Sequence, residues 1–309
     1  MIRVKNLRVD YDSTCAVRDL SLEVGTGEVC GLIGPNGAGK TTTMRAILGL
    51  IEPTYGEIEL DGVDMLEHPR DACKVVGFMP DFAPMYDDLY CWEFLDLFAG
   101  SYGIRKKDRP QTVDRMLERV GLTEKRKGRV GELSRGMRQR LMLAKTLIPR
   151  PKILMLDEPA SGMDPQGRID LKNLLKSLAG EGTTVLVSSH ILSEMTEFCT
   201  SVAIMEKGRM VINGTIDDVR KRVMGGTVLE IELVGGEDDL RRIAAENAAA
   251  GTIDKKDDSH FLIPFNGDAT LAADFLADLV LGGARVASFA TKREGLEELF
   301  LKVGAKELS

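Results

Sequence analysis

The segment "GPNGAGKT", residues 34–41, contains the residues whose types and spacing define a chemistry most clearly. It matches the pattern G-x-x-x-x-G-K-[ST] and lies between a predicted strand and a segment with helical spacing. Glycines let successive backbone N–H groups point inward, and the N-terminus of the following helix adds positive partial charge. We expect Lys40 to reach the β- and γ-phosphates of a nucleoside triphosphate and Thr41 to ligate Mg²⁺.

An acidic pair follows a second apolar run, "ILMLDEP", residues 153–159. Asp157 comes at the end of this predicted buried strand, where its carboxylate can hold Mg²⁺ directly or through water. Glu158 is next, and a carboxylate there can orient or deprotonate water, which is otherwise a poor nucleophile. His190 ends a further apolar run, "LVSSH", and is a candidate contact to the γ-phosphate. Together these side chains indicate hydrolysis as well as binding.

Parallel strands followed by helices are needed to position these groups. Short apolar runs at 27–34, 152–159 and 183–190 are typical of buried parallel strands, which favours an α/β fold. The earlier segments at 1–11, 17–25 and 53–62 predict the strands of an antiparallel subdomain. From about residue 86 to 148 the sequence predicts mostly helices. The predicted fold class is therefore a P-loop NTPase core with an antiparallel β subdomain and a helical insertion at about 82–148.

A composition shift near "RKRVMGGTV", residues 220–228, marks a predicted domain boundary. The expected domains are residues 1–220, the nucleotide-binding part, and residues 226–309, an accessory part. Strand and helix patterns in the second part follow the order βαββαβ, which predicts a small α+β, ferredoxin-like domain. A last helix is expected over "GLEELFLKV", residues 295–303.

Composition excludes several classes of function. The 41 basic and 48 acidic residues give a net charge of −7, so we expect no nucleic acid partner and no direct binding to an anionic membrane. Five cysteines without a C-x-x-C pair indicate free thiols in a reducing compartment. The opening residues lack the apolar run of a signal peptide, and no stretch is long enough to span a bilayer. A soluble chain is expected, and any membrane role requires a partner.

Several motifs, in this order, resemble the ATP-binding subunit of ABC transporters over residues 1–220. Residues 76–95 correspond to the family's Q-loop, and "LSRGM" at 133–137 corresponds to its signature. The D-loop corresponds to "SGMD" at 161–164, and the switch histidine is His190. The resemblance implies ATP and Mg²⁺ as cofactors, with Glu158 and His190 catalytic. It places ATP in contact with Tyr11 (stacked on adenine, with Val17 a weaker neighbour), Gly34, Pro35, Asn36, Gly37, Ala38, Gly39, Lys40, Thr41, Thr42, Ser134 and Gly136.

Two departures from the family pattern stand out. Asp81 follows Pro80 where the Q-loop usually has Gln, so the implied metal ligands are Thr41, Asp157 and Asp81. The signature, commonly L-S-G-G-Q, keeps Ser134 and Gly136 but has Arg135 in place of the first Gly and Met137 in place of the Gln. Arg135 either adds a charge beside the ATP of a facing subunit or extends into solvent.

The resemblance also implies partners and a location. A chain with one P-loop works as a homodimer, docked through residues near 78–92 on an integral-membrane permease at the inner face of the cell membrane. The accessory domain resembles that of ABC-2 type exporters, which implies export; the transported substrate is not encoded in recognisable motifs. A soluble ABC ATPase acting on ribosomes or DNA and a nucleotide-sensing scaffold without turnover are the alternatives. Soluble ABC ATPases of this kind typically have two ATP-binding domains. The presence of Lys40, Asp157 and Glu158 argues against a scaffold without turnover.

Overall fold

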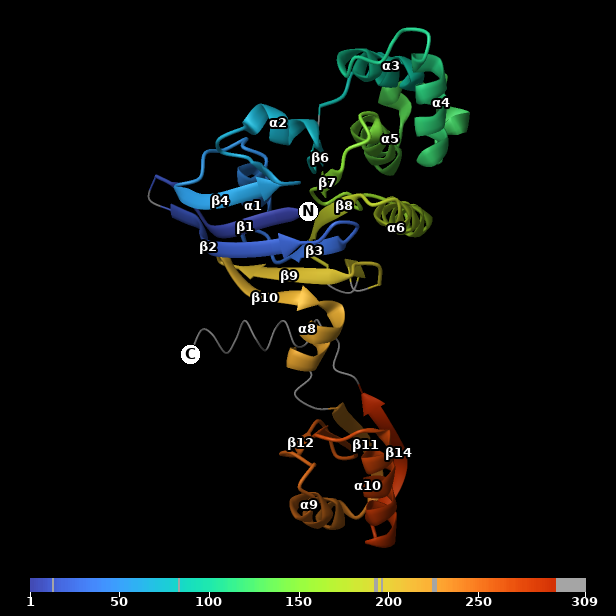
Figure 1. Ribbon diagram of the computed structural model, residues 1–309. Coiled ribbons are helices and arrows are strands. Elements are labelled where there is room, and N and C mark those ends of the chain that lie inside the picture. Colours follow the sequence, from blue (N-terminus) through green and yellow to red (C-terminus); the bar gives the residue numbers. More distant parts are fainter. Residues whose placement is uncertain (13, 83, 192–193, 196, 224–226, 293–309) are drawn as a thin grey trace. The chain divides into compact units, whose positions relative to one another are not determined.

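The computed structural model describes residues 1–309 except 13, 83, 192–193, 196, 224–226 and 293–309 (Figure 1). The chain divides into two compact units, Met1–Ile216 and Asp217–Ser309. The helix predicted over 295–303 lies outside the described residues. Among the described helices, none combines the length and the apolar character that a membrane crossing requires.

A six-stranded sheet is the centre of the first unit, with the strand order β10-β9-β3-β8-β7-β6. The bounds are β3 (Val29–Ile33), β6 (Val76–Met79), β7 (Ile153–Leu156), β8 (Thr184–Ser189), β9 (Ser201–Glu206) and β10 (Arg209–Thr215). Neighbouring strands are parallel except for the antiparallel pair β9–β10. Because the carboxyl ends of parallel strands meet at one edge of a sheet, the segments after β3, β7 and β8 lie close together.

A second, antiparallel sheet has the order β2-β1-β4-β5. The bounds are β1 (Ile2–Tyr11), β2 (Thr14–Val24), β4 (Tyr55–Leu60) and β5 (Val63–Asp64), and the short helix α2 (Pro69–Lys74) follows. Helix α1 (Lys40–Ile47) adds Met44 and Ile47 to a core that it shares with strands of both sheets. Each of these buried side chains contributes about 1.5–3 kcal/mol to folding. The helix that follows the phosphate turn is therefore firmly anchored.

The predicted helical insertion is confirmed. Helices α3 (Cys91–Ser101), α4 (Arg109–Arg119) and α5 (Arg135–Leu147) contact one another and form a group beside the six-stranded sheet (Figure 1). Two short 3₁₀ turns, Thr123–Lys125 and Val130–Glu132, connect α4 to α5. Helix α6 (Pro165–Gly180) leads back to the sheet and packs against β3 and β8.

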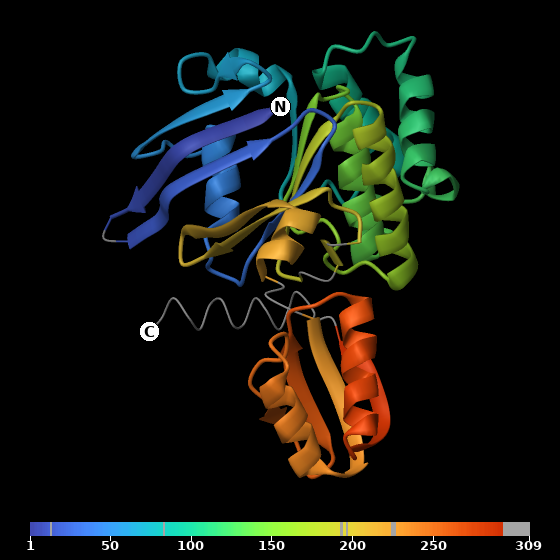
Figure 2. The same cartoon turned by 60° about the horizontal axis from the view of Figure 1, so that its bottom comes forward.

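The second unit contains β11 (Thr227–Gly235), α9 (Glu237–Glu246), β12 (Asp254–Lys255), β13 (His260–Phe265), α10 (Ala269–Leu281) and β14 (Arg285–Lys292). Helix α8 (Ile216–Val223) spans the boundary between the units. The antiparallel strand order β12-β13-β11-β14 confirms the ferredoxin-like prediction. Helices α9 and α10 contact each other and pack with the strands (Figure 2). The core that they share includes the fully buried side chains of Phe261 and Phe275.

Candidate active site

The turn between β3 and α1 is shaped by glycines that no other residue can replace. A Cβ at Gly34 would lie 2.3 Å from the carbonyl oxygen of Met205. Gly39 has φ +101°, and a Cβ there would lie 2.7 Å from the carbonyl oxygen of Ala16. The backbone is therefore pressed against β9 and β2, in a conformation that favours glycine. A glycine-rich turn of this kind, placed directly before a helix, is the arrangement that binds phosphate in other proteins.

Lys40 is held inside this turn. Its side chain is almost fully buried, and its Nζ donates to the carbonyl oxygens of Gly34 at 2.6 Å and Pro35 at 3.3 Å. Glu158 Oε1 lies 3.7 Å from the same Nζ, so the two groups form a partly buried ion pair. These bonds keep the ammonium group over the turn, where it can meet phosphate oxygens.

Asp157 joins the phosphate turn to the strands β7 and β8. Its side chain is buried, and its two oxygens accept from Thr41 Oγ1 at 2.8 Å and from Ser188 Oγ at 2.6 Å. In the described part of the chain, no group of three or more His, Cys, Asp or Glu residues is arranged to hold a metal by itself. The Thr41–Asp157 pair nevertheless offers two hard oxygens side by side, of the kind that Mg²⁺ prefers.

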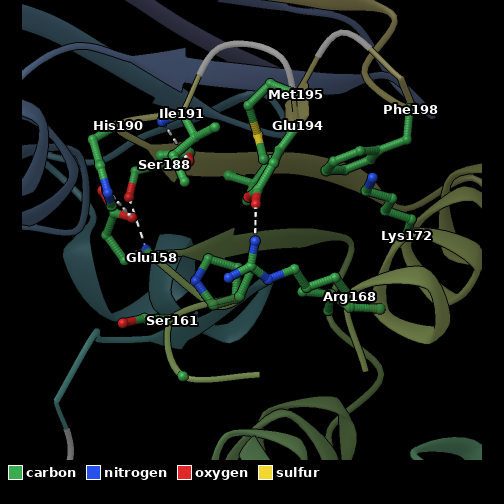
Figure 3. A pocket seen from close by; sticks show the side chains of 16 residues that line it. Glu158, Ser161, Arg168, Lys172, Ser188, His190, Ile191, Glu194, Met195 and Phe198 are labelled. Atoms are coloured by element: carbon green, nitrogen blue, oxygen red, sulfur yellow. Dashed lines mark hydrogen bonds and ion pairs between the residues drawn. The ribbon is translucent and has the colours of Figure 1, made fainter. Parts of the chain in front are cut away.

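Glu158 adopts a left-handed backbone conformation, with φ +48°. For a residue other than glycine this conformation costs free energy, and such residues gather at functional sites. The backbone N–H of Glu158 donates to Ser188 Oγ at 2.9 Å, which fixes the turn. His190 Nδ1 lies 3.0 Å from Glu158 Oε2, and Figure 3 shows the two side chains facing each other. Because a carboxylate only accepts hydrogen bonds, the Nδ1 position carries the proton.

A pocket of about 460 Å³ opens beside the phosphate turn. It is lined by Thr14, Cys15, Ala16, Arg18, Pro35, Asn36, Gly37, Ala38, Gly39, Lys40, Thr41, Thr42, Asp81, Asp157, Glu158, Lys207 and Gly208. The structure thus brings together the predicted turn, the acidic pair and Asp81. Tyr11, predicted to stack on adenine, lies at the end of β1, is 45% exposed and does not appear among the described lining residues.

The sequence patterns did not predict six residues of this pocket: Thr14, Cys15, Ala16, Arg18, Lys207 and Gly208. Gly208 connects this group to the phosphate turn, because it accepts from the backbone N–H of Arg18 at 2.7 Å and donates to the carbonyl oxygen of Ala38 at 3.0 Å. Lys207 and Gly208 form the turn between β9 and β10, far from residue 34 in sequence. No local pattern signals that contact.

The signature segment stands apart from the phosphate pocket, at the N-terminus of α5. Ser134 caps this helix, since its Oγ accepts from the backbone N–H of Met137 at 3.3 Å. A Cβ at Gly136 would lie 3.2 Å from the carbonyl oxygen of Gly162 in the D-loop. Neither Ser134 nor Gly136 is among the described residues that line the pocket. Both predicted ATP contacts therefore lie outside the described lining of the phosphate pocket in their own chain.

Arg135 lies against the D-loop of its own chain. Its Nη2 donates to Ser161 Oγ at 2.8 Å, and a Cβ on Gly162 would lie 2.4 Å from Arg135 Cδ. The side chain is therefore not simply extended into solvent. It connects the start of the signature helix to the D-loop.

We expect Arg135→Ala to lower the rate of ATP hydrolysis about 3- to 10-fold, since a hydrogen bond of this kind contributes roughly 1 kcal/mol. ATP affinity at the phosphate turn should stay unchanged. If Arg135 acts through Ser161, the double variant with Ser161→Ala will be no slower than Arg135→Ala alone, measured by steady-state ATPase kinetics. Additive losses with a raised KM for ATP would instead indicate contact with nucleotide.

Two ion pairs hold the segment after β8 against α6. Arg168 pairs with Glu194, and Lys172 pairs with Glu197. Figure 3 shows Arg168 and Lys172 pointing from α6 toward this segment, around a cavity of about 150 Å³ that Glu158 and His190 also line. We call this pair of contacts the α6 clamp. It ties the segment that carries His190 to the helix that begins after the D-loop.

A parallel sheet with a phosphate turn after one strand and an acidic pair after another defines a P-loop nucleoside triphosphatase. Residues 17–161 match the family described as "ABC transporter". An uncharacterized ABC transporter ATP-binding protein of Synechocystis sp. is 34% identical over 289 residues, which cover 93% of this chain and 78% of the relative. The chain belongs to the ATP-binding subunits of ABC transporters, and it is an ATP-binding, ATP-hydrolysing enzyme.

Further relatives extend this result over the whole chain. The Nod factor export ATP-binding protein I of Cupriavidus pinatubonensis is 32% identical over 308 residues, covering 100% of this chain and 92% of the relative. The bacitracin transport ATP-binding protein of Bacillus licheniformis is 38% identical over 223 residues, covering 72% of each chain. A solved structure described as the ATP binding subunit of an ABC transporter has a TM-score of 0.66 at 30% identity, covering 72% of this chain and 92% of its own.

Proposed function

We propose that this chain works as a homodimer at the inner face of the cell membrane and drives export through a separate permease. The observation that supports the dimer is the separation, within one chain, of two groups of residues that we expect to contact ATP. Lys40 and Asp157 line the phosphate pocket, whereas Ser134 and Gly136 lie elsewhere, next to the D-loop. A second copy would bring its signature segment to the pocket of the first, and so complete two sites.

Magnesium fits the residues at the phosphate turn. Thr41 and Asp157 would hold it, with Asp81 on the same pocket wall as an added carboxylate. When bound, the ion would supply positive charge to the β- and γ-phosphates. Lys40 would exchange its bonds to Gly34 and Pro35 for phosphate oxygens.

Glu158 is the proposed general base. Its backbone is fixed by Ser188, and its carboxylate lies between Lys40 and His190. A carboxylate held in this way can take the proton of an attacking water. His190 would orient Glu158 and contact the γ-phosphate.

The permease would dock near residues 78–92. Phe82 is 87% exposed and Tyr86 is 58% exposed, which is unusual for side chains of this size. Asp87 and Asp88 lie beside them in the sequence. Asp81, in the same segment, lines the phosphate pocket, and Gln139 of α5 donates to its carbonyl oxygen at 3.1 Å. A partner that moves this segment would therefore act on the ATP site directly.

Export is favoured by the relatives whose names specify a direction and by the ferredoxin-like second unit. We expect affinity purification of the chain from membranes to recover a polytopic membrane protein. Phe82→Ala/Tyr86→Ala should reduce this recovery at least about tenfold, because large exposed aromatic side chains often dominate interface energies. Tyr102→Ala, at another aromatic residue that is 46% exposed, is the matched control. Unchanged recovery with the double variant would contradict this docking segment, and recovery of ribosomes alone would favour a soluble ATPase.

A further inference from the structure

A basic pocket of about 370 Å³ lies in the first unit, where α4 meets the segments that follow α5 and α6. Four cations line it: Arg115, Arg119, Arg150 and Lys152. Glu181 is the one carboxylate among its described lining residues. Apolar side chains complete the wall, namely Met116, Leu147, Pro151 and Leu178.

The cations of this pocket are only partly balanced. Arg119 pairs with Glu181, and Lys152 Nζ lies 2.6 Å from Asp61 Oδ2. Arg115 and Arg150 form no ion pair with any residue in the described part of the chain. The pKa of Arg115 is lowered, first by burial and then by the charges of Arg150 and Arg119. Like charges thus gather here in a chain whose net charge is −7.

We infer that the basic pocket binds a small phosphorylated compound. Guanidinium groups present paired N–H donors that match phosphate oxygens, and Arg115 and Arg150 have these donors available. Thr183 adds a hydroxyl group to the same wall. The volume lies within the range of small-molecule sites, roughly 300–1,000 Å³, and the apolar wall suits the organic part of such a ligand.

This site is separate from the ATP site. Lys152 and Thr183 immediately precede β7 and β8, whereas Glu158 and His190 follow the same strands. Because both strands run in parallel, the basic pocket lies at the opposite edge of the sheet. A ligand here would hold α4, part of the helical insertion, against the segments that enter β7 and β8.

The test is calorimetric titration with inorganic pyrophosphate, in a Lys40→Ala background that weakens binding at the phosphate turn. We expect one binding site, and a loss of at least about tenfold in affinity in Arg115→Gln/Arg150→Gln, since each change removes a charged hydrogen-bond donor. Lys106→Gln/Lys107→Gln removes the same charge from exposed positions outside the pocket and should keep full affinity.

Absence of binding, or equal losses in both double variants, would overturn the proposal. Binding to phosphatidylglycerol vesicles without binding to pyrophosphate would overturn it as well, because the ligand would then be a membrane surface. If Arg115→Gln/Arg150→Gln does not fold, the single change Arg150→Gln at an exposed loop position provides the test. Pyrophosphate should raise the melting temperature of the Lys40→Ala protein and leave that of Lys40→Ala/Arg150→Gln unchanged.

Discussion

Glu158→Gln is expected to bind ATP normally and to hydrolyse it at least about 100-fold more slowly, the usual scale for loss of a general base. Gln has almost the same shape as Glu, so the contacts to Lys40 and His190 can be kept in altered form. An amide, however, does not take a proton from water. ATP affinity would be measured by equilibrium binding and turnover by phosphate release.

The same variant tests the proposed dimer. If hydrolysis separates two subunits that ATP holds together, Glu158→Gln should accumulate as an ATP-bound dimer in size-exclusion chromatography. Glu67→Gln, at an exposed position outside the pocket, serves as the matched control and should behave as the unaltered chain. Normal turnover by Glu158→Gln would remove this residue from the role of base.

Lys40→Ala is expected to weaken ATP binding by about 30-fold or more and to abolish turnover. The ammonium group is buried in the phosphate turn, and hydrogen bonds from a charged donor contribute about 1.5–3 kcal/mol each. At about 1.4 kcal/mol for each factor of ten, one such contact to phosphate accounts for the loss. The measurement is calorimetry with a slowly hydrolysed ATP analogue.

A stability control separates lost binding from lost folding. Lys40→Ala leaves the carbonyl oxygens of Gly34 and Pro35 without their donor, so a modest decrease in melting temperature is expected. Lys40→Met keeps much of the side-chain volume without the charge and should fold better while binding ATP as poorly. ATP affinity within threefold of the unaltered chain in Lys40→Met would show that the charge is not required.

Local patterns in the sequence predicted the parts of the fold that follow simple rules. The runs "GLI", "ILML" and "VLVSS" belong to β3, β7 and β8, because strands buried on both faces need continuous apolar residues. The βαββαβ order of the second unit was readable in the same way, since strand and helix periodicities alternate there. The phosphate turn and the acidic pair were found because each depends on residues adjacent in sequence.

What the sequence did not predict depends on contacts between distant segments. Arg18 and Lys207 reach the phosphate pocket because Gly208 bonds to Ala38 across the sheet. Arg135 contacts Ser161 because the signature helix packs on the D-loop, an arrangement that single-residue patterns do not encode. The left-handed backbone of Glu158 arises from the turn that Ser188 fixes, and nothing in the letters "DEP" indicates it.

The α6 clamp has a consequence for how this chain can vary. Reversing the charge at Arg168 alone would place two carboxylates against each other at Glu194, a penalty that a second reversal at Glu194 removes. Lys172 and Glu197 are linked in the same way one helical turn further on. Across related chains that keep this fold, we therefore expect the charges at 168 and 194, and at 172 and 197, to change as coupled pairs. Each such paired change would show that the contact between α6 and the segment that carries His190 has been maintained.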